Sequence, residues 1–505
     1  MIGFERGLAT ATGLLLPAFA AVLLSGCVVG PDYQRPLLAM PASWSGQKAA
    51  KSAQLSKWWL RLRDPELNAL VDEAVAGNLD VATARAKIRE ARASYRQSVA
   101  TLLPSADGSA SATRNRVAAS SSGTSASETY GQYQAGFDAS WELDLFGANR
   151  RGVEAASYGL DASEENLRQT LLTLVGDVGS NYAQARGYQT RIALARRSAA
   201  SQRQTAELTR TMALAGTATA ADVAKAMGQA SGTEAEIPTL EANYAEAVHR
   251  LSVLTGRPPA ALAERLKRVM PIPTPRLPIP TGIPADILLT RPDVRMAERQ
   301  YAQYTAKIGQ AEAARYPGVS LTGDISTTAL KLGDLGKNST IGWSFGPSLS
   351  VPLFNAGRLE AAVDVARAQR DQYFIAYKAS VLTALEDVEN ALVSLAQERI
   401  RNGKLASSTK SYTDAAQLER TLYKAGEASL LDVLDAERSA YSAEDSLLQS
   451  RVSIATDYIA LNKALGGGWD GAIDTTGPEI IDVGTGPRLA SETQQAAVDG
   501  SNKSP

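Results

Sequence analysis

The 505-residue chain has a single cysteine, Cys27, and a single histidine, His249. One cysteine cannot form a disulfide within the chain, and a structural zinc site needs four such ligands. A Ser-His-Asp mechanism would depend on His249, which lies in a helical-looking segment with no nucleophile motif beside it. The chain also has no GxSxG motif of hydrolases at a predicted strand-to-helix turn, no GxxxxGK(S/T) motif and no GxGxxG motif after a predicted strand. The sequence therefore predicts a protein that is not an enzyme and that has no cofactor and no metal site.

An excess of one charge and long hydrophobic runs are lacking as well. The chain has 52 basic and 53 acidic residues, so it has no positive excess of the kind that attracts nucleic acid. Aromatic residues make up only 6%, and the abundance of leucine and alanine is typical of a mainly helical protein. No segment after Cys27 reaches the roughly 18 apolar residues that a transmembrane helix needs. Any further membrane span must therefore be a β-barrel.

The first 26 residues have the pattern of a lipoprotein signal peptide. Arg6 supplies a positive start, and Leu14–Leu24 is an apolar stretch too short to span a membrane. The stretch ends in Leu24-Ser25-Gly26-Cys27, which resembles a bacterial lipobox. Cys27 is thus the predicted site of S-diacylglycerol and N-palmitoyl attachment, and Val28 in place of aspartate favours sorting to the outer membrane. The alternative is an ordinary secretory signal with an incidental cysteine.

The mature chain is a tandem repeat with a period of roughly 210 residues, far longer than a solenoid repeat. Four pairs of landmarks recur at this distance: Leu102-Leu-Pro104 with Arg315-Tyr-Pro317, Trp141–Phe146 with Leu349–Phe354, Leu214-Ala-Gly216 with Lys424-Ala-Gly426, and Leu254-Thr-Gly256 with Ala464-Leu-Gly466. We predict a first repeat at residues 27–270, a Pro-rich linker at 271–284, a second repeat at 285–469 and a tail at 470–505 that we expect to be disordered.

Each repeat has the same predicted order of elements: a shorter helix, two strands, and two long helices. The strands are expected at about 105–116, 130–146, 318–329 and 341–354, and the long helices at about 148–215, 219–255, 356–425 and 429–465. Helices of about 70 residues would be roughly 100 Å long, which is typical of coiled coils rather than of globular cores. Leu434, Tyr441, Leu448 and Ala455 recur every seven residues, as expected for a packed seam.

The predicted strands alternate apolar and polar residues. In residues 132–145 the odd positions are mostly apolar and the even positions polar, and residues 341–353 alternate in the same way. This pattern suits a barrel wall, but a half-buried sheet of a soluble protein gives the same pattern. Since bacterial barrels have at least eight strands, four strands per chain could not close one alone, and we favour three chains with twelve strands.

Six motifs, in order, resemble the TolC/OprM (NodT-like) outer membrane factor family. They are Val29-Gly-Pro-Asp-Tyr-Gln-Arg-Pro36, Trp141-Glu-Leu-Asp-Leu-Phe-Gly147 with Arg150-Arg151, Arg291-Pro-Asp-Val-Arg295, Pro352-Leu-Phe-Asn-Ala-Gly-Arg358, Leu431-Asp-Val-Leu-Asp-Ala-Glu-Arg438 and Lys463-Ala-Leu-Gly-Gly-Gly-Trp469. The resemblance implies a mainly α protein with a small transmembrane β part. It implies a homotrimer with a 12-stranded β-barrel that continues into a long α-helical periplasmic tunnel.

The resemblance also implies partners and a gate. The partners are a periplasmic adaptor and an inner-membrane transporter, often of the proton-driven RND class, and the protein is an exit duct for drugs or other small molecules. By resemblance, the helix-turn tips are Gly216 and Gly426. Leu431 and Asp435 match the positions of the periplasmic constriction, and Asp432 is a further acidic candidate.

Three copies of Asp435 around one axis would form a ring of like charge that attracts cations. The alternative is a solvated helix face, where an aspartate near the N-terminus favours the helix dipole.

Two other functions remain open from the sequence. One is an outer-membrane duct for ABC-type protein secretion, and the other is a coiled-coil envelope lipoprotein that conducts nothing. The strand alternation argues against the second. The transported substrate is not indicated.

Overall fold

The computed structural model describes residues 28–36, 57–117, 127–275 and 285–468, together with two short strands near the C-terminus, β5 (Ile481–Asp482) and β6 (Gly486–Pro487). The predicted signal peptide and Cys27 lie outside the described residues, and so does most of the Pro-rich linker. Apart from β5 and β6, the tail that we expected to be disordered also lies outside them.

The chain divides into two compact units. Unit 1 consists of residues 1–37, 88–163 and 296–377, and unit 2 of residues 38–87, 164–295 and 378–505. Both halves of the tandem repeat contribute to each unit. The repeats are therefore intertwined in space rather than folded as two separate domains.

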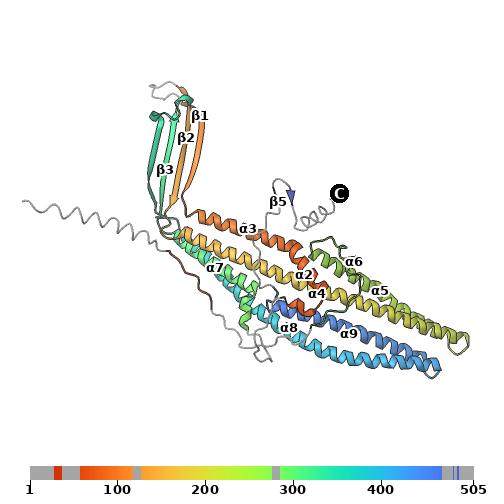
Figure 1. The fold of residues 1–505 in the computed structure, drawn as a ribbon. Helices are drawn as coiled ribbons and strands as arrows, with labels where there is room; N and C mark the ends of the chain where they lie inside the picture. Colours follow the sequence, from red (N-terminus) through yellow and green to blue (C-terminus); the bar gives the residue numbers. More distant parts are fainter. Residues whose placement is uncertain are drawn as a thin grey trace, which may run out of the picture. The chain divides into compact units, whose positions relative to one another are not determined.

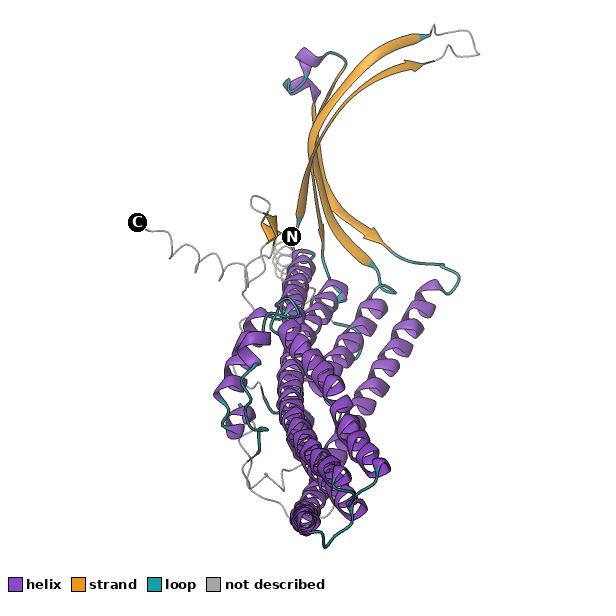
Figure 2. Cartoon of the chain, turned by 90° about the vertical axis from the view of Figure 1, so that its right-hand side faces the viewer, coloured by secondary structure: helices purple, strands orange, loops and turns teal. Residues whose placement is uncertain are grey.

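Unit 1 contains a four-stranded antiparallel sheet with the order β1-β2-β3-β4. Its strands are β1 (Ser105–Val117), β2 (Glu128–Glu142), β3 (Gly318–Ala329) and β4 (Ile341–Ser350). The strands are long and curved, and β1, β2 and β3, which Figure 1 labels, lie side by side (Figures 1 and 2). Because β2 pairs with β3, the sheet joins the two repeats along one continuous ladder.

Two strands end four residues earlier than the sequence suggested, β2 at Glu142 and β4 at Ser350. After β2, the carboxylate of Asp144 accepts hydrogen bonds from the backbone N–H groups of Asn149 (3.1 Å) and Arg150 (2.8 Å). Asp144 thus satisfies free donors at the start of the next helix, which draws the chain out of the strand. After β4, Pro352 has no N–H to donate to a ladder.

The helices account for most of the chain. The longest are α4 (Ala148–Leu214) and α8 (Arg358–Ala425), of 67 and 68 residues. Each is followed by a 35-residue helix, α5 (Ala220–Leu254) or α9 (Leu430–Ala464). The shorter helices are η1 (Trp58–Leu62), α2 (Pro65–Gly77), α3 (Leu79–Ala100), α6 (Ala263–Leu266), η2 (Ala285–Thr290) and α7 (Pro292–Ala313), with η3 (Leu332–Asp334) and η4 (Asn338–Thr340) between β3 and β4. Within the described residues, none of these helices is both long and apolar enough to cross a membrane.

Glycines on α4 allow α9 to pack closely against it in unit 2. A Cβ atom on Gly187 would lie 2.3 Å from Val452 Cγ2, and one on Gly179 would lie 3.1 Å from Ile459 Cδ1. Glycine weakens a helix interior by roughly 1 kcal/mol. Here the absent side chains make room for the neighbouring helix, which offsets that cost through packing.

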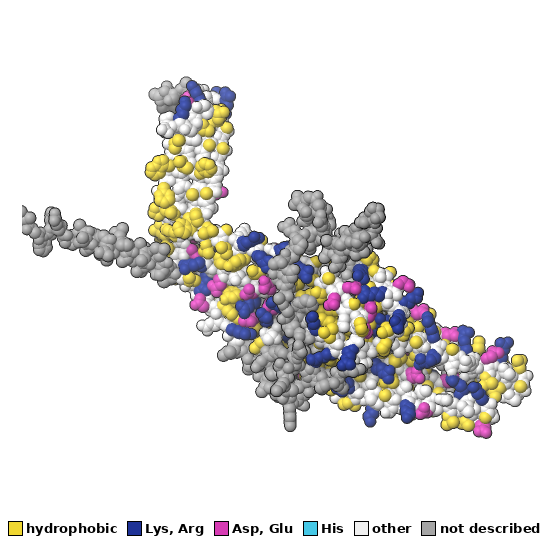
Figure 3. Space-filling view, viewed as in Figure 1, with side chains coloured by type: hydrophobic (Ala, Val, Ile, Leu, Met, Phe, Trp, Pro, Cys, Tyr) yellow, Lys and Arg dark blue, Asp and Glu magenta, His cyan; other side chains and the backbone are white. Residues whose placement is uncertain are grey.

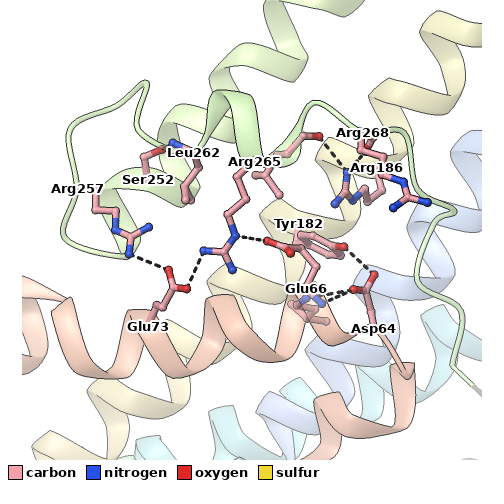
Figure 4. A network of polar contacts seen from close by, with 12 residues as sticks. Asp64, Glu66, Glu73, Tyr182, Arg186, Ser252, Arg257, Leu262, Arg265 and Arg268 are labelled. Atoms are coloured by element: carbon pink, nitrogen blue, oxygen red, sulfur yellow. Dashed lines mark hydrogen bonds and ion pairs between the residues drawn. The ribbon is translucent and has the colours of Figure 1, made fainter. Parts of the chain in front are cut away.

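A polar network fixes α2 and α6 to the long helices of unit 2 (Figure 4). Asp64 caps α2 by accepting hydrogen bonds from the N–H groups of Glu66 (2.9 Å) and Leu67 (3.2 Å), and its second oxygen accepts one from the Tyr182 hydroxyl (2.7 Å). Arg265 forms ion pairs with Glu66 (2.6 Å) and with a second acidic residue of α2, Glu73 (2.7 Å). The Asp64 carboxylate thus joins the start of α2 to the middle of α4.

This geometry predicts the order of two substitutions. Asp64→Ala removes the cap of α2 and leaves the fully buried Tyr182 hydroxyl without its acceptor, so we expect a loss of about 2–4 kcal/mol. Tyr182→Phe removes a single hydrogen bond and should cost about 1 kcal/mol. The measurement is thermal unfolding of the purified protein, with Asp80→Ala, an exposed acid in the first turn of α3, as the control. Equal midpoints for Asp64→Ala and Asp80→Ala would contradict this account.

Candidate functional site

One face of the sheet is apolar on all four strands. Directly paired residues share a face, so the register Gly108–Phe137–Ile325–Trp343 defines one row of this face across the four strands. The neighbouring rows contain Trp141, Leu321, Phe345 and Leu349, among others, and alanine or glycine on β1. Several of these side chains are largely exposed, including Trp343 (76%), Phe137 (69%) and Phe345 (69%).

The opposite face is polar. It carries serine, threonine, glutamine, aspartate and glycine, and its central row joins Asp107, Asp138, Asp324 and Ser344 on successive strands. Like charges placed opposite each other destabilise a sheet, so this row is not explained by strand stability alone. This row was not predicted from the sequence. Each aspartate occupies an alternate position on the polar side of its strand, but only the strand register places the three side by side.

The apolar face has the height expected for a bilayer. Val319 to Ala329 spans roughly 34 Å along the strand at about 3.4 Å per residue, and a tilt of roughly 40° reduces this to about 26 Å, close to the apolar band of outer-membrane barrels. Hydrophobic side chains gather over the strands, and Lys and Arg side chains mark the end of the sheet where the strand loops lie (Figure 3). On β1 the apolar positions give way to Arg114 and Arg116 at this end.

The helix turns of unit 2 are copies of each other. Gly216 (φ +80°) ends α4 and Gly426 (φ +78°) ends α8, both in the left-handed region that favours glycine. After α4, Gly216 N–H donates to Ala213 O (3.0 Å) and Thr217 N–H to Met212 O (2.9 Å). The same two bonds, at 3.0 and 2.9 Å, recur 210 residues later. This is the Schellman arrangement, which satisfies the last carbonyls of a helix.

The next helices begin with equivalent capping boxes. Thr219 and Asp222 cap α5, and Ser429 and Asp432 cap α9, each pair exchanging side-chain and backbone hydrogen bonds. The hydrogen bonds from Thr219 and the charge of Lys225 hold the pKa of the Asp222 carboxyl below its ordinary value. This cap is therefore retained at neutral pH and lost only as the pH falls through that lowered pKa. Asp432 is one of the predicted gate residues. In the structure its carboxylate is part of the capping box of α9.

Leu431 and Asp435 lie on the other side of α9 from its packed face. Leu431 is 68% exposed, whereas Val433 is completely buried with Tyr423, Ala206 and other residues in one apolar cluster. Asp435 is exposed and forms an ion pair with Arg438. The two candidates are one helical turn apart, so their side chains are on the same face. At the matching positions of the first repeat are Ala221 and Lys225.

Comparison with known proteins gives the family. The model of the family described as "Outer membrane efflux protein" matches residues 70–257 and 283–467. The chain belongs to the outer membrane efflux protein family. The two matched segments correspond to the two repeats, and the resemblance drawn from the six motifs is confirmed.

Relatives within this family cover nearly the whole chain. Nodulation protein T of Rhizobium leguminosarum bv. trifolii is 36% identical over 90% of this chain and 97% of its own length. The solvent efflux pump outer membrane protein SrpC of Pseudomonas putida is 34% identical over 90% of this chain and 98% of its own length. Among solved structures, the outer-membrane channel OprN has a TM-score of 0.82 at 33% identity and covers 88% of this chain and 100% of its own. SrpC is the outer membrane protein of an efflux pump, and OprN is an outer-membrane channel. The predicted fold class and the predicted function as an outer-membrane efflux channel are confirmed.

The capping boxes lead to a prediction that separates Asp432 from Asp435. Asp432→Ala and Asp222→Ala should each increase amide hydrogen exchange severalfold in the first turn of α9 or α5, because each removes one half of a capping box. Asp435→Ala should leave exchange in α9 unchanged, because among the described residues its carboxylate pairs only with the exposed Arg438. Hydrogen exchange read by mass spectrometry makes the comparison, and equal effects of the two α9 substitutions would refute the assignment of the cap.

Proposed function

We propose that this chain is the exit duct of a tripartite efflux pump, which forms a homotrimer in the outer membrane and releases drugs or other small molecules. The two-faced sheet supports this proposal most directly. An exposed face of tryptophan, phenylalanine and leucine suits lipid, and a face of aspartate and serine suits an aqueous lumen. In the trimer, twelve strands would form one β-barrel and the long helices a periplasmic tunnel.

The free sheet edges support an assembly of several copies. Within the described part of the chain, β1 and β4 each pair along one side only. In lipid, an open edge leaves backbone N–H and C=O groups unsatisfied at several kcal/mol each. Three copies would pair each β4 edge with the β1 edge of a neighbour, and a barrel of twelve strands is wide enough to leave a lumen.

Helix α8 carries a surface that a neighbouring copy could cover. Its exposed apolar residues in unit 2 include Leu382 (57%), Val393 (55%), Ile400 (61%) and Leu418 (60%). Their spacings of 11, 7 and 18 residues keep all four within roughly 20° of one line at 100° per residue. Exposed apolar residues that share one side of a solvated helix are typical of a helix contact, and we propose that another protomer supplies this contact.

The partners and the anchor belong to the same proposal. We propose acylation at Cys27, a periplasmic adaptor, and an inner-membrane transporter of the RND class. The relatives' names refer to solvents, toluene, antibiotics and cations. This variety supports a duct that takes its cargo from the transporter, so we propose small molecules as a class rather than one compound.

Deletion of the chain tests the function. We expect greater accumulation of a fluorescent dye and lower inhibitory concentrations for several toxic small molecules, both reversed by the wild-type chain. Unchanged accumulation of all compounds, with outer-membrane trimers present in the wild type, would instead point to protein export or to a redundant duct.

Asp435→Ala tests the gate. We propose that Leu431 and Asp435 narrow the periplasmic end of the duct, with Asp432 adding its charge near the tip. The substitution removes three like charges from one ring. We expect the resting conductance to rise severalfold, because the cations bound by the three carboxylates hold the pore narrow at this level.

Single-channel recording in planar bilayers measures this conductance. Glu264→Ala removes another exposed acid, from α6 (87% side-chain exposure, against 61% for Asp435), and should change nothing. A conductance for Asp435→Ala equal to that of the wild type would reject this residue as part of the gate.

A further inference from the structure

The segment that follows Cys27 is held against unit 1 by a buried arginine. Arg151, at the start of α4, is 4% exposed. It donates hydrogen bonds to the carbonyls of Val29 and Gly30, both at 3.2 Å, and to the carboxylate of Asp32 at 2.7 Å. These residues belong to the first motif of the sequence, to which the proposed channel assigns no role.

Gly30 lets this segment lie directly on α7. Its φ of +90° is in the region that favours glycine, and a Cβ atom there would lie 2.3 Å from the Cα of Gly309. Two glycines, one on each side of the contact, bring the backbones together. Any side chain at position 30 would therefore move the segment off the helix.

Tyr33 anchors the other end of the segment. Its ring packs edge-on against Tyr158 and Tyr301, each 5.7 Å away, and its hydroxyl donates a 2.7 Å hydrogen bond to Glu298. Burial and the neighbouring Glu298 raise the pKa of Tyr33 well above its ordinary value, so the hydroxyl remains a donor. Arg35 lies 3.5 Å from the same carboxylate.

The fixed segment passes the base of the sheet. The N–H of Val29 donates to the carbonyl of Phe146 (3.2 Å), four residues after the end of β2. Gly147 is so close to Val28 that a Cβ atom would lie 2.9 Å from Val28 Cγ1. The ring of Phe146 stacks on Tyr316 at 4.6 Å, two residues before β3 begins. Position 28 is thus held where the apolar face of the sheet ends.

We propose that residues 28–36 form a tether that fixes where the acyl chains on Cys27 enter the membrane, beside the base of β2, with Arg151 as its positioning residue. The partner is the acyl layer of the outer membrane. A free segment of nine residues would let the anchor range over roughly 16 Å, whereas the tether holds it within a residue of Val28. This inference rests on the proposed lipid anchor at Cys27.

A photoactivatable fatty acid tests the tether. Cells that incorporate the fatty acid at Cys27 are irradiated, and the cross-linked tryptic peptides of the purified trimer are identified by mass spectrometry. The strands β2, β3 and β4 lie in separate peptides, residues 117–150, 316–331 and 338–358. In the wild type we expect the peptide at 117–150 to carry the largest share of the cross-linked fatty acid. Arg151→Met should spread the label severalfold toward the other two.

The controls separate positioning from general stability. Arg367→Met removes a surface pair with Glu312 in the same unit and should keep the wild-type pattern. If Arg151→Met yields no trimer, Tyr33→Phe removes only one hydroxyl and should shift the pattern in the same direction.

Each alternative result identifies what fails. A wild-type pattern in both tether variants, or a wild-type label concentrated away from residues 117–150, would overturn the tether and leave the efflux function intact. A chain that takes up no fatty acid would overturn the lipid anchor, and with it the tether, whereas dye accumulation tests the efflux function separately.

Discussion

The rest of the structure depends on the backbone hydrogen bonds at the two edges of one small sheet. β1 and β4 pair on one side only within the described residues, and the face between them exposes Phe137, Trp343 and Phe345. Water could satisfy the edges but not the apolar face, and lipid could cover the face but not satisfy the edges. Copies of the chain in lipid meet both demands at once. The same assembly would bring the exposed apolar line of α8 against a neighbouring protomer.

The short segment between β2 and α4 is a second place where a few contacts determine several features of the structure. Asp144 ends β2 by capping α4, and the adjacent turn at Gly147 gives Val28 room to pass. In the same short stretch, Arg151 binds the segment after Cys27. Three functions therefore meet within eight residues: the end of the membrane wall, the start of a long helix, and the place of the proposed lipid anchor. A substitution in this stretch would affect more than one of these functions. The effects of two substitutions here on stability should therefore not be additive.

Much of the fold could be predicted from the sequence because its signals are local. Glycines at 216 and 426 mark the helix turns, the absence of proline marks the two longest helices, and alternation marks the strands. Other features depend on contacts between distant residues. The acidic row requires the register of three strands, and the early end of β2 requires the reach of Asp144 to α4. The tether was visible only as a motif, because Gly309 and Glu298, which explain Gly30 and Tyr33, are more than 260 residues away.

The differences between the repeats are more informative than their likeness. Both turns share the same glycine geometry and the same capping box, so the duplicated parts are those that fold a helix pair. Within and just after the capping box the copies diverge, with Leu431 and Asp435 in one and Ala221 and Lys225 in the other. In a trimer, an acidic ring from one repeat could alternate with a basic ring from the other at the same level. Opposite charges there would hold the helix pairs together at the tip, and salt would weaken that attraction because the groups are exposed. The capping aspartates Asp222 and Asp432 are present in both repeats and contribute no such asymmetry. For this reason we propose that Asp435, which duplication did not preserve, is the main acidic residue of the gate.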